Sequence, residues 1–314
     1  MNKESTTKIP LIFATDDGYV PFLSVALKSI IENANKDYFY PVYILTAGLS
    51  SENISKLKEL ENENFSIETV DVTKNLNELK SSLHLRDYYS KAIYYRIFIP
   101  TLFRQYEKAI YLDCDIVVTD DISKMYFVDL KDNLLGAITE EVMINVDVFG
   151  RYSEEALGVE RNNYFNSGVL LMNLELMRKE KIEEQFFALL EKFKFIVAPD
   201  QDYLNVVCKD RVTYLDKGWN RTPINDKTFN DNNLHLIHYK MAWKPWHYDD
   251  VLYGDIFWKY ANSTNFIDKI VYIKENYSSS DVQNDKDSYD KLVQTALKDI
   301  NDEGNYFKTI SKNK

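Results

Sequence analysis

The chain is poor in cysteine and in positive charge. Only two of its 314 residues are cysteines, Cys114 and Cys208, and both lie within apolar segments. Such cysteines are typical of buried thiols in a reducing compartment. Lys and Arg number 38 against 49 Asp and Glu, which gives a net charge of −11. This charge argues against a nucleic-acid partner and against simple electrostatic binding to anionic lipid, because both require a basic surface.

Long apolar runs are absent as well. No stretch of 18 apolar residues occurs, so we expect no transmembrane helix. The start, MNKESTTKIP, lacks the apolar centre of a signal peptide, and we expect a cytoplasmic protein. The chain is 45% hydrophobic, which is enough for one sizeable core. An acidic protein of this kind needs a metal ion or a few local cations to bind a phosphorylated substrate.

The first quarter of the chain alternates between strand-like and helix-like patterns. Strands are predicted over 9–14, 40–48 and 65–72, and helices over 19–34 and 50–64. Ser51 is the expected N-cap of the second helix. This order is typical of a parallel sheet covered by helices. Ligands bind beyond the carboxyl ends of such strands, where Asp16 and Asp17 follow the first one.

The rest of the chain continues the alternation. Helices are predicted over 90–103, 181–193 and 199–208, and strands after Gly168 and from residue 234. Pro100 is expected to bend or end the first of these helices. The polar segment 278–288 predicts a linker, and the apolar stripe from Tyr289 to Ile300 predicts a helix with one buried face. We therefore divide the chain into a main domain, 1–277, and a small helical appendage, 278–314.

Three Asp-x-Asp pairs occur in the chain: Asp113 with Asp115, Asp200 with Asp202, and Asp285 with Asp287. The third lies in the predicted linker, where we expect it to be solvated, and the second lies at a predicted helix start, where acids suit the helix dipole. Only the first interrupts an apolar strand, AIYLDCDIVV. If that segment stays extended, Asp113 and Asp115 point to one face and Cys114 to the other. Two adjacent carboxylates favour a hard divalent cation between or beyond them.

Two other interpretations of this pair remain open at this point. Both acids could accept hydrogen bonds from neighbouring backbone amides at a strand end. The spacing LDCDIV also fits the haloacid-dehalogenase-like phosphatases, in which the first aspartate is a nucleophile. Those enzymes usually carry the motif on their first strand and follow it with Gly-Thr, whereas here it lies more than a hundred residues into the chain.

Six segments, in this order, resemble the retaining glycosyltransferases of family 8, which include bacterial lipopolysaccharide galactosyl- and glucosyltransferases. They are FATDDGYV, YYRIFIP, YLDCDIVV, YFNSGVLLMNL, DQDYLN and HYKMAWKPWH, and they extend over most of the chain. The resemblance implies a glycosyltransferase-A fold, a Rossmann-like α/β architecture with a mixed sheet flanked by helices. It also implies a uridine-diphosphate hexose donor and a bound manganese ion.

The resemblance further implies which residues hold the metal and the donor. Asp113, Asp115 and His238 are the expected metal ligands, and an imidazole favours Mn²⁺ over Mg²⁺, although Mg²⁺ stays possible. The donor-binding residues implied by the resemblance are Ala14, Thr15, Asp16, Tyr19, Arg96, Asp113, Cys114 and Lys244. Gly18 and Met241 depart from the family pattern, which commonly has asparagine and glycine at these positions.

The groups implied at the reaction centre are Arg96, Asn166, Asp200 and Gln201. Alternatives are a snorkelling surface arginine for Arg96 and a packed histidine for His238. Glu140 corresponds to an acidic family position, with a solvated loop acid as the alternative. No carboxylate is an evident nucleophile, so the expected mechanism is same-face attack with retention of the anomeric configuration.

The expected partners are a UDP-sugar donor and a glycan or glycoprotein acceptor. The tail from residue 278 carries six lysines against seven acids, which does not make a membrane anchor. We expect it to pack on its own chain, outside the nucleotide site. The sequence leaves open galactose or glucose as the donor sugar, the oligomeric state, and a non-catalytic carbohydrate- or nucleotide-binding protein on the same fold.

Overall fold

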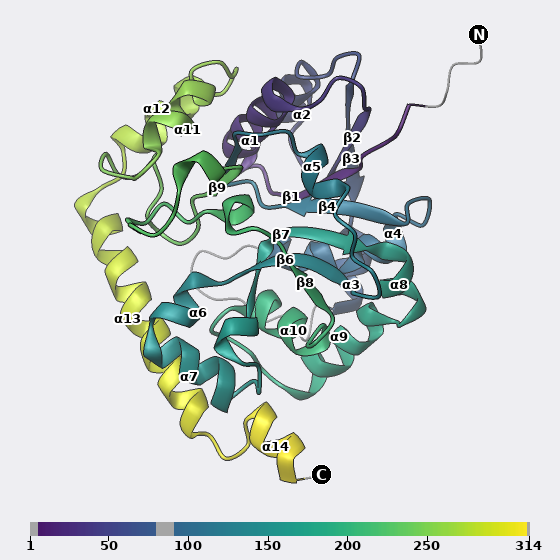
Figure 1. Ribbon diagram of the computed structural model, residues 1–314. Helices are drawn as coiled ribbons and strands as arrows, with labels where there is room; N and C mark the ends of the chain where they lie inside the picture. Colours follow the sequence, from purple (N-terminus) through teal and green to yellow (C-terminus); the bar gives the residue numbers. More distant parts are fainter. Residues whose placement is uncertain (1–5, 80–90, 313–314) are drawn as a thin grey trace.

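The structure is a computed structural model that describes residues 6–79 and 91–312 (Figure 1). Seven strands form a mixed sheet in the order β3-β2-β1-β4-β7-β6-β8. Their bounds are β1 Leu11–Ala14, β2 Tyr40–Thr46, β3 Phe65–Asp71, β4 Lys108–Leu112, β6 Leu135–Thr139, β7 Phe165–Asn173 and β8 Val212–Tyr214. The strands β3, β2, β1 and β4 are parallel to one another, as the sequence predicts for the first three, whereas β7 runs antiparallel to both β4 and β6.

A second, two-stranded sheet stands beyond the end of β4. It pairs β5, Ile116–Val118, with β9, Leu236–His238, in antiparallel fashion. The predicted single strand around Asp113 and Asp115 is therefore two strands, because the chain leaves the large sheet after Leu112 and joins the small one at Ile116. The register places His238 directly opposite Ile116. The two acids thus lie at the junction between the sheets.

Helices cover both faces of the large sheet (Figure 1). The α-helices are α1 Val20–Asn33, α2 Ser51–Lys58, α3 Thr73–Leu79, α4 Ile99–Leu102, α5 Ser123–Tyr126, α6 Glu141–Asn145, α7 Asp147–Glu155, α8 Leu174–Lys179, α9 Ile182–Lys192, α10 Pro199–Val207, α11 Gly254–Ala261, α12 Ile267–Glu275, α13 Ser279–Asn301 and α14 Tyr306–Lys312. Four 3₁₀ segments are η1 Lys91–Phe98, η2 Arg161–Asn163, η3 Lys217–Asn220 and η4 Asp231–Asn233.

The core is divided in two by the sheet. Ala109 and Tyr111 of β4 pack in one apolar cluster, with residues of η1, α7, α9 and α10, whereas Ile110 and Leu112 pack in the other, with residues of α1, α11 and α12. This alternation follows from the two-residue period of a strand that is covered on both faces. Burial of both faces fixes the register of β4, and so the place where Asp113 leaves the sheet.

Two local predictions are corrected. Ser50, not Ser51, is the N-cap of α2, and its hydroxyl accepts a hydrogen bond from the Asn53 amide at 3.3 Å. Pro100 does not end the helix that contains Arg96: residues 91–98 form the 3₁₀ segment η1, and Pro100 lies in the first turn of α4. A proline is tolerated there because the amide that it lacks has no intrahelical acceptor.

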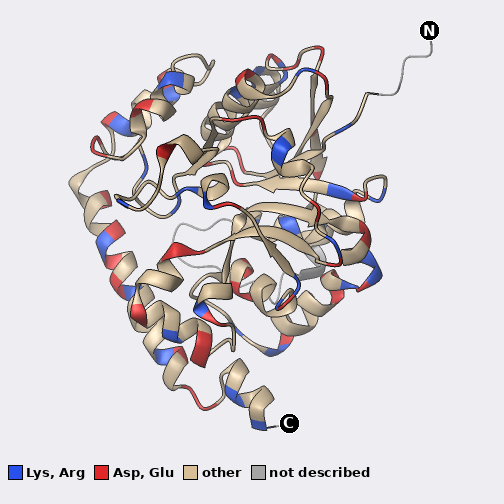
Figure 2. Ribbon diagram, in the orientation of Figure 1, with Lys and Arg blue, Asp and Glu red and all other residues tan. Residues whose placement is uncertain are grey.

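The predicted linker 278–288 is also wrong, because these residues form the first half of α13. Ser278 caps that helix in a capping box with Asp281: the Ser278 hydroxyl accepts from the Asp281 amide, and the Asp281 carboxylate accepts from the Ser278 amide at 2.8 Å. Acidic and basic residues are interspersed along the helix (Figure 2). The polar composition of this segment therefore reflects a charged outer face rather than missing structure.

The C-terminal helices pack on their own chain, as expected. Leu292 and Ile300 of α13 are buried in the core, and the Tyr289 ring meets the Phe149 ring of α7 edge to face, with centroids 6.2 Å apart. The Tyr306 ring of α14 packs edge to face on Phe193, with centroids 5.1 Å apart. The division of the chain at residue 277 stays a prediction.

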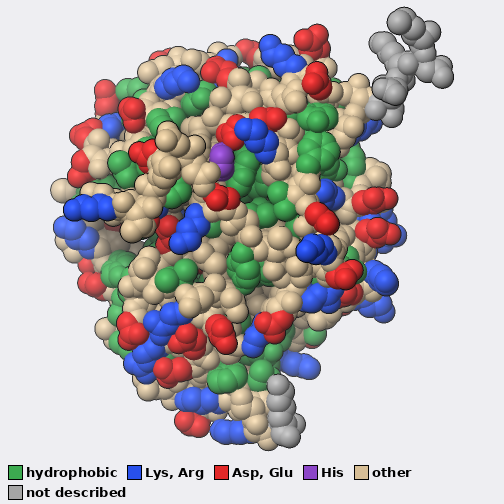
Figure 3. Space-filling model, viewed as in Figure 1, with side chains coloured by type: hydrophobic (Ala, Val, Ile, Leu, Met, Phe, Trp, Pro, Cys, Tyr) green, Lys and Arg blue, Asp and Glu red, His purple; other side chains and the backbone are tan. Residues whose placement is uncertain are grey.

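The face drawn in Figure 3 carries acidic, basic and apolar side chains interspersed rather than gathered into one large patch. Within residues 6–79 and 91–312, no helix combines the length and the apolar composition needed to cross a membrane.

Candidate active site

A cavity of about 570 Å³ opens at the carboxyl ends of β1 and β4. Its walls include every residue that the sequence predicts for the site: Ala14, Thr15, Asp16, Tyr19, Arg96, Asp113, Cys114, Asp115, Glu140, Asn166, Asp200, Gln201, His238 and Lys244. These residues come from segments that are far apart in the chain, and the strand ends and helix starts bring them together. The position agrees with the rule that ligands bind beyond the carboxyl ends of parallel strands.

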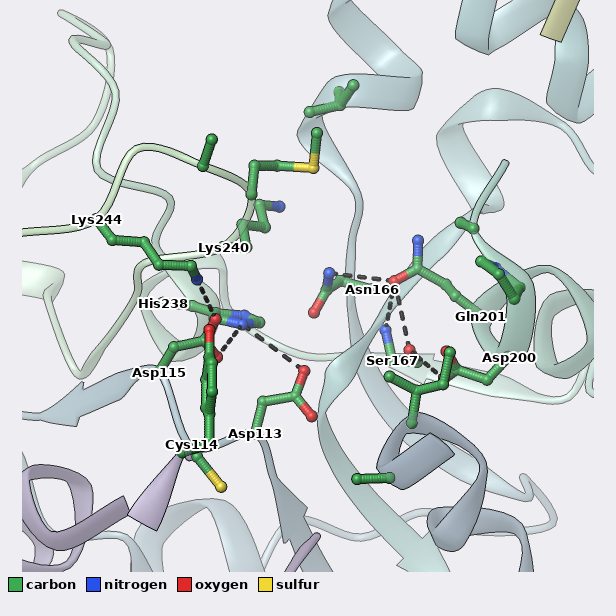
Figure 4. Close-up of a pocket in the computed structure, with 18 of the residues that line it drawn as sticks. Asp113, Cys114, Asp115, Asn166, Ser167, Asp200, Gln201, His238, Lys240 and Lys244 are labelled. Atoms are coloured by element: carbon green, nitrogen blue, oxygen red, sulfur yellow. Dashed lines mark hydrogen bonds and ion pairs between the residues drawn. The ribbon is translucent and has the colours of Figure 1, made fainter. Parts of the chain in front are cut away.

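Asp113, Asp115 and His238 form a cluster of potential metal ligands. Each of them offers one ligand atom, and these atoms all lie within 4.8 Å of one another. His238 Nε2 lies 3.2 Å from Asp115 Oδ1 and 3.8 Å from Asp113 Oδ2 (Figure 4). The backbone fixes this arrangement, because the Asp113 amide donates to the Gly168 carbonyl at 2.8 Å and the Tyr239 amide donates to the Asp115 carbonyl at 2.8 Å.

Gly168 leaves room for this cluster. A Cβ at this position would come within 2.4 Å of both Asp113 Oδ2 and His238 Cε1. Any side chain on residue 168 would therefore displace two of the three potential ligands. The sequence placed this glycine at a strand, and the structure gives the reason why a glycine is needed there.

Asn220, which the sequence did not indicate, holds the His238 ring. His238 Nδ1 lies 2.9 Å from Asn220 Oδ1, and Asn220 Nδ2 donates to Asn166 Oδ1 at 2.9 Å. The Asn220 oxygen can accept a hydrogen bond from Nδ1, and this contact directs Nε2 toward Asp115. An outer hydrogen bond of this kind orients metal-binding histidines in general.

The surroundings of Asp115 favour its negatively charged carboxylate. The Lys244 ammonium lies 2.6 Å from Asp115 Oδ2 and also donates to the Tyr239 carbonyl. Burial alone would raise the pKa of the Asp115 carboxyl, but Lys244 and His238 hold this pKa well below its usual range. A carboxylate pair with an imidazole nitrogen, already approached by an ammonium group, fits a divalent ion such as Mn²⁺.

Arg96 is buried, with 4% of its surface exposed, so it is not a snorkelling surface arginine. Its guanidinium joins two acids: Nη2 lies 3.1 Å from Asp113 Oδ1, and Nε lies 3.0 Å from Asp200 Oδ2. Nη1 also donates to the Ser167 carbonyl. Burial raises the pKa of Asp200 to about 6 even though Arg96 lowers it. Arg96 therefore links the potential metal ligands to the α10 side of the cavity.

Gln201 is held with its carbonyl oxygen turned toward β7. That oxygen accepts from the Ser167 amide at 2.9 Å and from Asn166 Nδ2 at 3.2 Å (Figure 4). The Gln201 amide nitrogen donates to the Tyr164 hydroxyl at 3.3 Å, and Tyr164 in turn donates to Asp202 Oδ1 at 2.5 Å. The orientation of the Gln201 amide is thus fixed from both ends.

Glu140 is buried rather than a solvated loop acid, since 5% of its surface is exposed. It caps α6, forms an ion pair with Lys240 and accepts from Asn166 Nδ2 at 2.7 Å. Burial alone would raise the pKa of Glu140, but the Lys240 ammonium keeps it below its ordinary value. Lys240 lines the cavity and, like Asn220 behind it, was not indicated by the sequence.

Asp16 and Tyr19 stand at the start of α1. Asp16 Oδ1 accepts from the Gly18 amide at 3.0 Å and from the Tyr19 amide at 3.3 Å, so it also stabilises the strand-to-helix turn. The Tyr19 ring meets the Phe22 ring edge to face, with centroids 5.1 Å apart. Beside them, the buried Cys114 thiol donates to the Ala14 carbonyl at 3.4 Å, and burial raises its pKa well above the ordinary value.

The C-terminal helix α13 also borders this cavity. Five residues on one face of α13 line the same cavity: Asp281, Asn284, Asp285, Ser288 and Leu292. The helix therefore borders the candidate site, and its place outside the nucleotide site stays a prediction. Asp285 is not simply solvated either, because it accepts hydrogen bonds from the Tyr248 hydroxyl at 2.6 Å and the Tyr277 hydroxyl at 2.5 Å.

Comparison with known proteins identifies the family to which this chain is similar. The model of the family described as "Glycosyl transferase family 8" matches residues 10–250. A putative glycosyltransferase of Haemophilus influenzae is 28% identical over 245 residues, which are 76% of this chain and 72% of that protein. The lipopolysaccharide 1,2-glucosyltransferase of Escherichia coli K12 is 26% identical over 263 residues, which are 78% of this chain and 75% of that protein.

Solved glycosyltransferases share the fold. The bifunctional glycosyltransferase WbbM superposes with a TM-score of 0.74 and 26% identity, over 88% of this chain and 53% of that one. The galactosyltransferase LgtC, solved with donor and acceptor sugar analogues, superposes with a TM-score of 0.67 and 26% identity, over 82% of this chain and 96% of that one. The mixed sheet flanked by helices is the expected glycosyltransferase-A fold, and the chain belongs to glycosyl transferase family 8.

Proposed function

We propose that this chain transfers a hexosyl group, galactose or glucose, from a UDP-sugar to a hydroxyl of a glycan acceptor, with retention of the anomeric configuration. Membership of the family implies a nucleotide-sugar donor and a glycan acceptor. The observation that carries the finer proposal is the cluster of Asp113, Asp115 and His238 in one cavity with Gln201. Both hexoses are included because one relative is named a glucosyltransferase and one similar structure a galactosyltransferase.

Asp113, Asp115 and His238 are the proposed ligands of a divalent ion. When bound, such an ion supplies positive charge against the diphosphate leaving group. The nitrogen ligand favours Mn²⁺, with Mg²⁺ as the weaker alternative. Lys244, which already lies against Asp115, is the second cation available to a diphosphate. The metal ion and Lys244 would offset the repulsion between an acidic protein and an anionic donor.

The other predicted residues of the site are proposed to hold the sugar and the nucleoside. Asn166 and Asp200 face the cavity with an amide and a carboxylate, which suit the paired donors and acceptors of a hexose. Arg96 holds Asp113 and Asp200 in place through its two ion pairs. Ala14, Thr15, Asp16, Tyr19 and Cys114 line the end of the cavity at β1, which is proposed to take the uridine.

Retention is proposed to occur by attack on one face of the sugar. The two buried acids that line the cavity near Gln201 are engaged with cations, Asp200 with Arg96 and Glu140 with Lys240, so neither is an evident nucleophile. The acceptor hydroxyl bonds to the anomeric carbon as the bond to the diphosphate breaks, and a phosphate oxygen takes the hydroxyl proton. The carbonyl of Gln201 supports the positive charge that develops on the sugar ring.

A nucleotide-sugar screen tests this function. The purified chain is incubated with UDP-galactose, UDP-glucose and GDP-mannose, with Mn²⁺ or with EDTA, and release of the nucleotide diphosphate is measured. We expect hydrolysis of a UDP-hexose that requires the metal, and an α-linked product in the initial NMR spectrum when an acceptor is present. Equal use of GDP-mannose, activity in EDTA or a β-linked initial product would contradict the proposal. Binding of UDP without hydrolysis or transfer would instead indicate a non-catalytic binding protein.

A further inference from the structure

The inward face of α13 changes character along its length. Cavity-lining residues recur at the helical spacing 281, 284, 285, 288 and 292, and the same face continues through Ala296 and Ile300 in the core. Its first four positions are polar, and its later positions are apolar. The change occurs where the helix passes from the cavity to the packed core. A buried face is normally apolar, so polar residues that face a cavity indicate a surface for a ligand.

The polar half of this face contacts the loop that carries Lys244. Asp285 accepts from the hydroxyls of both Tyr248 and Tyr277. The Tyr277 ring stacks on His247, with centroids 3.9 Å apart and planes at 9°. Tyr277 and His247 both line the cavity. The helix and the loop therefore form one continuous wall of the cavity.

Two polar side chains on this wall are available to a ligand. Within residues 6–79 and 91–312, neither the amide of Asn284 nor the hydroxyl of Ser288 has a hydrogen-bond partner. An amide and a hydroxyl can each donate and accept a hydrogen bond. They match sugar hydroxyls, which do the same. The wall lies across the cavity that also contains Gln201, so a ligand bound here would face the proposed reaction centre.

The charge of the wall excludes one class of ligand. Within residues 6–79 and 91–312, the lysines and the arginine that line the cavity already face acids: Arg96 faces Asp113 and Asp200, Lys240 faces Glu140, and Lys244 faces Asp115. Asp281 and Asp285 add two further carboxylates, and within the described part of the chain their hydrogen-bond partners are the uncharged groups of Ser278, Tyr248 and Tyr277. Burial lowers the pKa of His247 to about 4, so the ring adds no positive charge at neutral pH. An anionic ligand is repelled at this wall.

We propose that the polar inward face of α13 is the acceptor subsite, and that it selects an uncharged, hydroxyl-rich glycan over one that carries phosphate or carboxylate. This inference rests on the proposed transferase function. It assigns acceptor choice to a helix that lies beyond the family match, which ends at residue 250. The shared part of the chain would then handle the donor, and α13 would choose what receives the sugar.

The test uses a panel of neutral hexosides and the same sugars as 6-phosphates and uronic acids. With the full-length chain, the metal and the UDP-hexose that it hydrolyses, we expect transfer to neutral members with kcat/KM at least tenfold above that of their charged counterparts. Transfer to no neutral member, or equal transfer to the charged ones, would overturn the proposal. Failure of donor hydrolysis itself would contradict the transferase function instead, so the two failures are distinguishable.

Variants then locate the subsite on α13. Asn284→Ala and Ser288→Ala should raise KM for the neutral acceptor roughly 5–20-fold, as expected for a lost hydrogen bond of about 1–2 kcal/mol, while KM for the donor changes less than twofold. Asp281→Asn should lower the ratio of kcat/KM for the neutral acceptor to kcat/KM for its 6-phosphate. The matched controls are on the outward face, Gln283→Ala and Asp290→Asn, which should behave as the unmodified chain. If the outward variants change acceptor KM as much as the inward ones, the subsite is not on this face.

Discussion

Two Asp-x-Asp pairs of the same spacing have different roles in this molecule. Asp113 and Asp115 leave an extended strand and both line the cavity, whereas of Asp200 and Asp202, in the first turn of α10, only Asp200 does. Asp113 and Asp115 reach the same cavity because the chain bends between β4 and β5, whereas residues two apart on a helix point about 200° apart. Asp202 is therefore turned into the core. The meaning of such a motif is set by the backbone that carries it.

Asp115 and Asp202, the second acids of the two pairs, differ in their hydrogen-bond and ion-pair partners as much as in their positions. Asp115 faces an ammonium group and an imidazole, which hold its pKa low. Asp202 is fully buried and faces neutral donors: the hydroxyls of Tyr152 and Tyr164 and the amide of Ala198. Burial raises the pKa of Asp202 to about 7, more than these hydrogen bonds lower it. The surroundings of Asp115 favour its charged form, whereas Asp202 supports Gln201 from behind through the Tyr164 hydroxyl.

The largest expected effect comes from removing the charge of Asp115. Asp115→Asn should lower metal-dependent transfer by about 10³-fold or more, because a weakened metal site forfeits several kcal/mol of electrostatic stabilisation. The fold should survive, since asparagine can still accept a hydrogen bond from Lys244. Initial rates of UDP release over a Mn²⁺ titration measure the loss, and circular dichroism checks the fold.

Asp287→Asn is the matched control for this change. Asp287 belongs to the third pair, lies exposed on α13 and accepts from Gln283 at 2.8 Å. Its substitution removes the same charge from the same kind of motif and should leave the rate within twofold. Equal losses in both variants would mean that net charge, and not the cluster around Asp115, governs the activity.

Much of the site could be predicted from the sequence because its signals are local. Acids that interrupt or follow an apolar strand stand out, and the alternation of strands and helices indicates where the carboxyl ends of those strands meet. For this reason Asp16, Asp113 and Asp115 were expected at one edge of the sheet, and they line one cavity. His238 depended on the family resemblance, since a lone histidine at a strand end gives no local signal.

The remaining features depend on contacts between distant residues. Asn220 acts on His238, 18 residues away, and on Asn166, 54 residues away, and an asparagine in a short 3₁₀ segment has no pattern that indicates either contact. The first half of α13 was expected to be a linker because the apolar spacing that identifies a helix begins only at Tyr289. Its inward residues are polar because they face a cavity, and a cavity is a property of the folded chain.

A smaller effect is expected when the support of His238 is removed without touching a carboxylate. Asn220→Ala deletes the acceptor of the Nδ1 proton and the link to Asn166. We expect metal affinity or activity to fall by about 10–100-fold, the usual cost of losing an outer hydrogen bond to a metal-binding histidine. Electron paramagnetic resonance of free Mn²⁺ during a titration measures the affinity directly.

Asn220→Asp refines this prediction. Aspartate keeps an oxygen for His238 Nδ1 but loses the amide that donates to Asn166, so it should retain more affinity than Asn220→Ala while still disturbing Asn166. Unchanged Mn²⁺ affinity in both variants would show that the ring is held by packing alone. Unchanged affinity in Asn220→Asp with reduced turnover would assign the Asn166 contact to the sugar side of the site.

The smallest expected effect is a change in the free energy of unfolding with pH. It comes from the titration of the buried Asp202. The folded pKa of about 7 lies above the ordinary value of 3.8 for an aspartate, so the folded state binds the proton more tightly. Stability from this group is complete below about pH 4 and is lost as the pH rises toward and through 7. Between pH 5 and pH 8, the free energy of unfolding should fall by on the order of 2 kcal/mol relative to Asp202→Asn, which does not titrate.

Urea unfolding of both chains at the two pH values measures the difference, and the comparison cancels the titration of all other groups. Asn at 202 can still accept from one tyrosine hydroxyl, so the variant should fold. If the two chains lose stability in parallel, Asp202 stays ionised in the folded state, and the contrast with Asp115 lies in position rather than in charge.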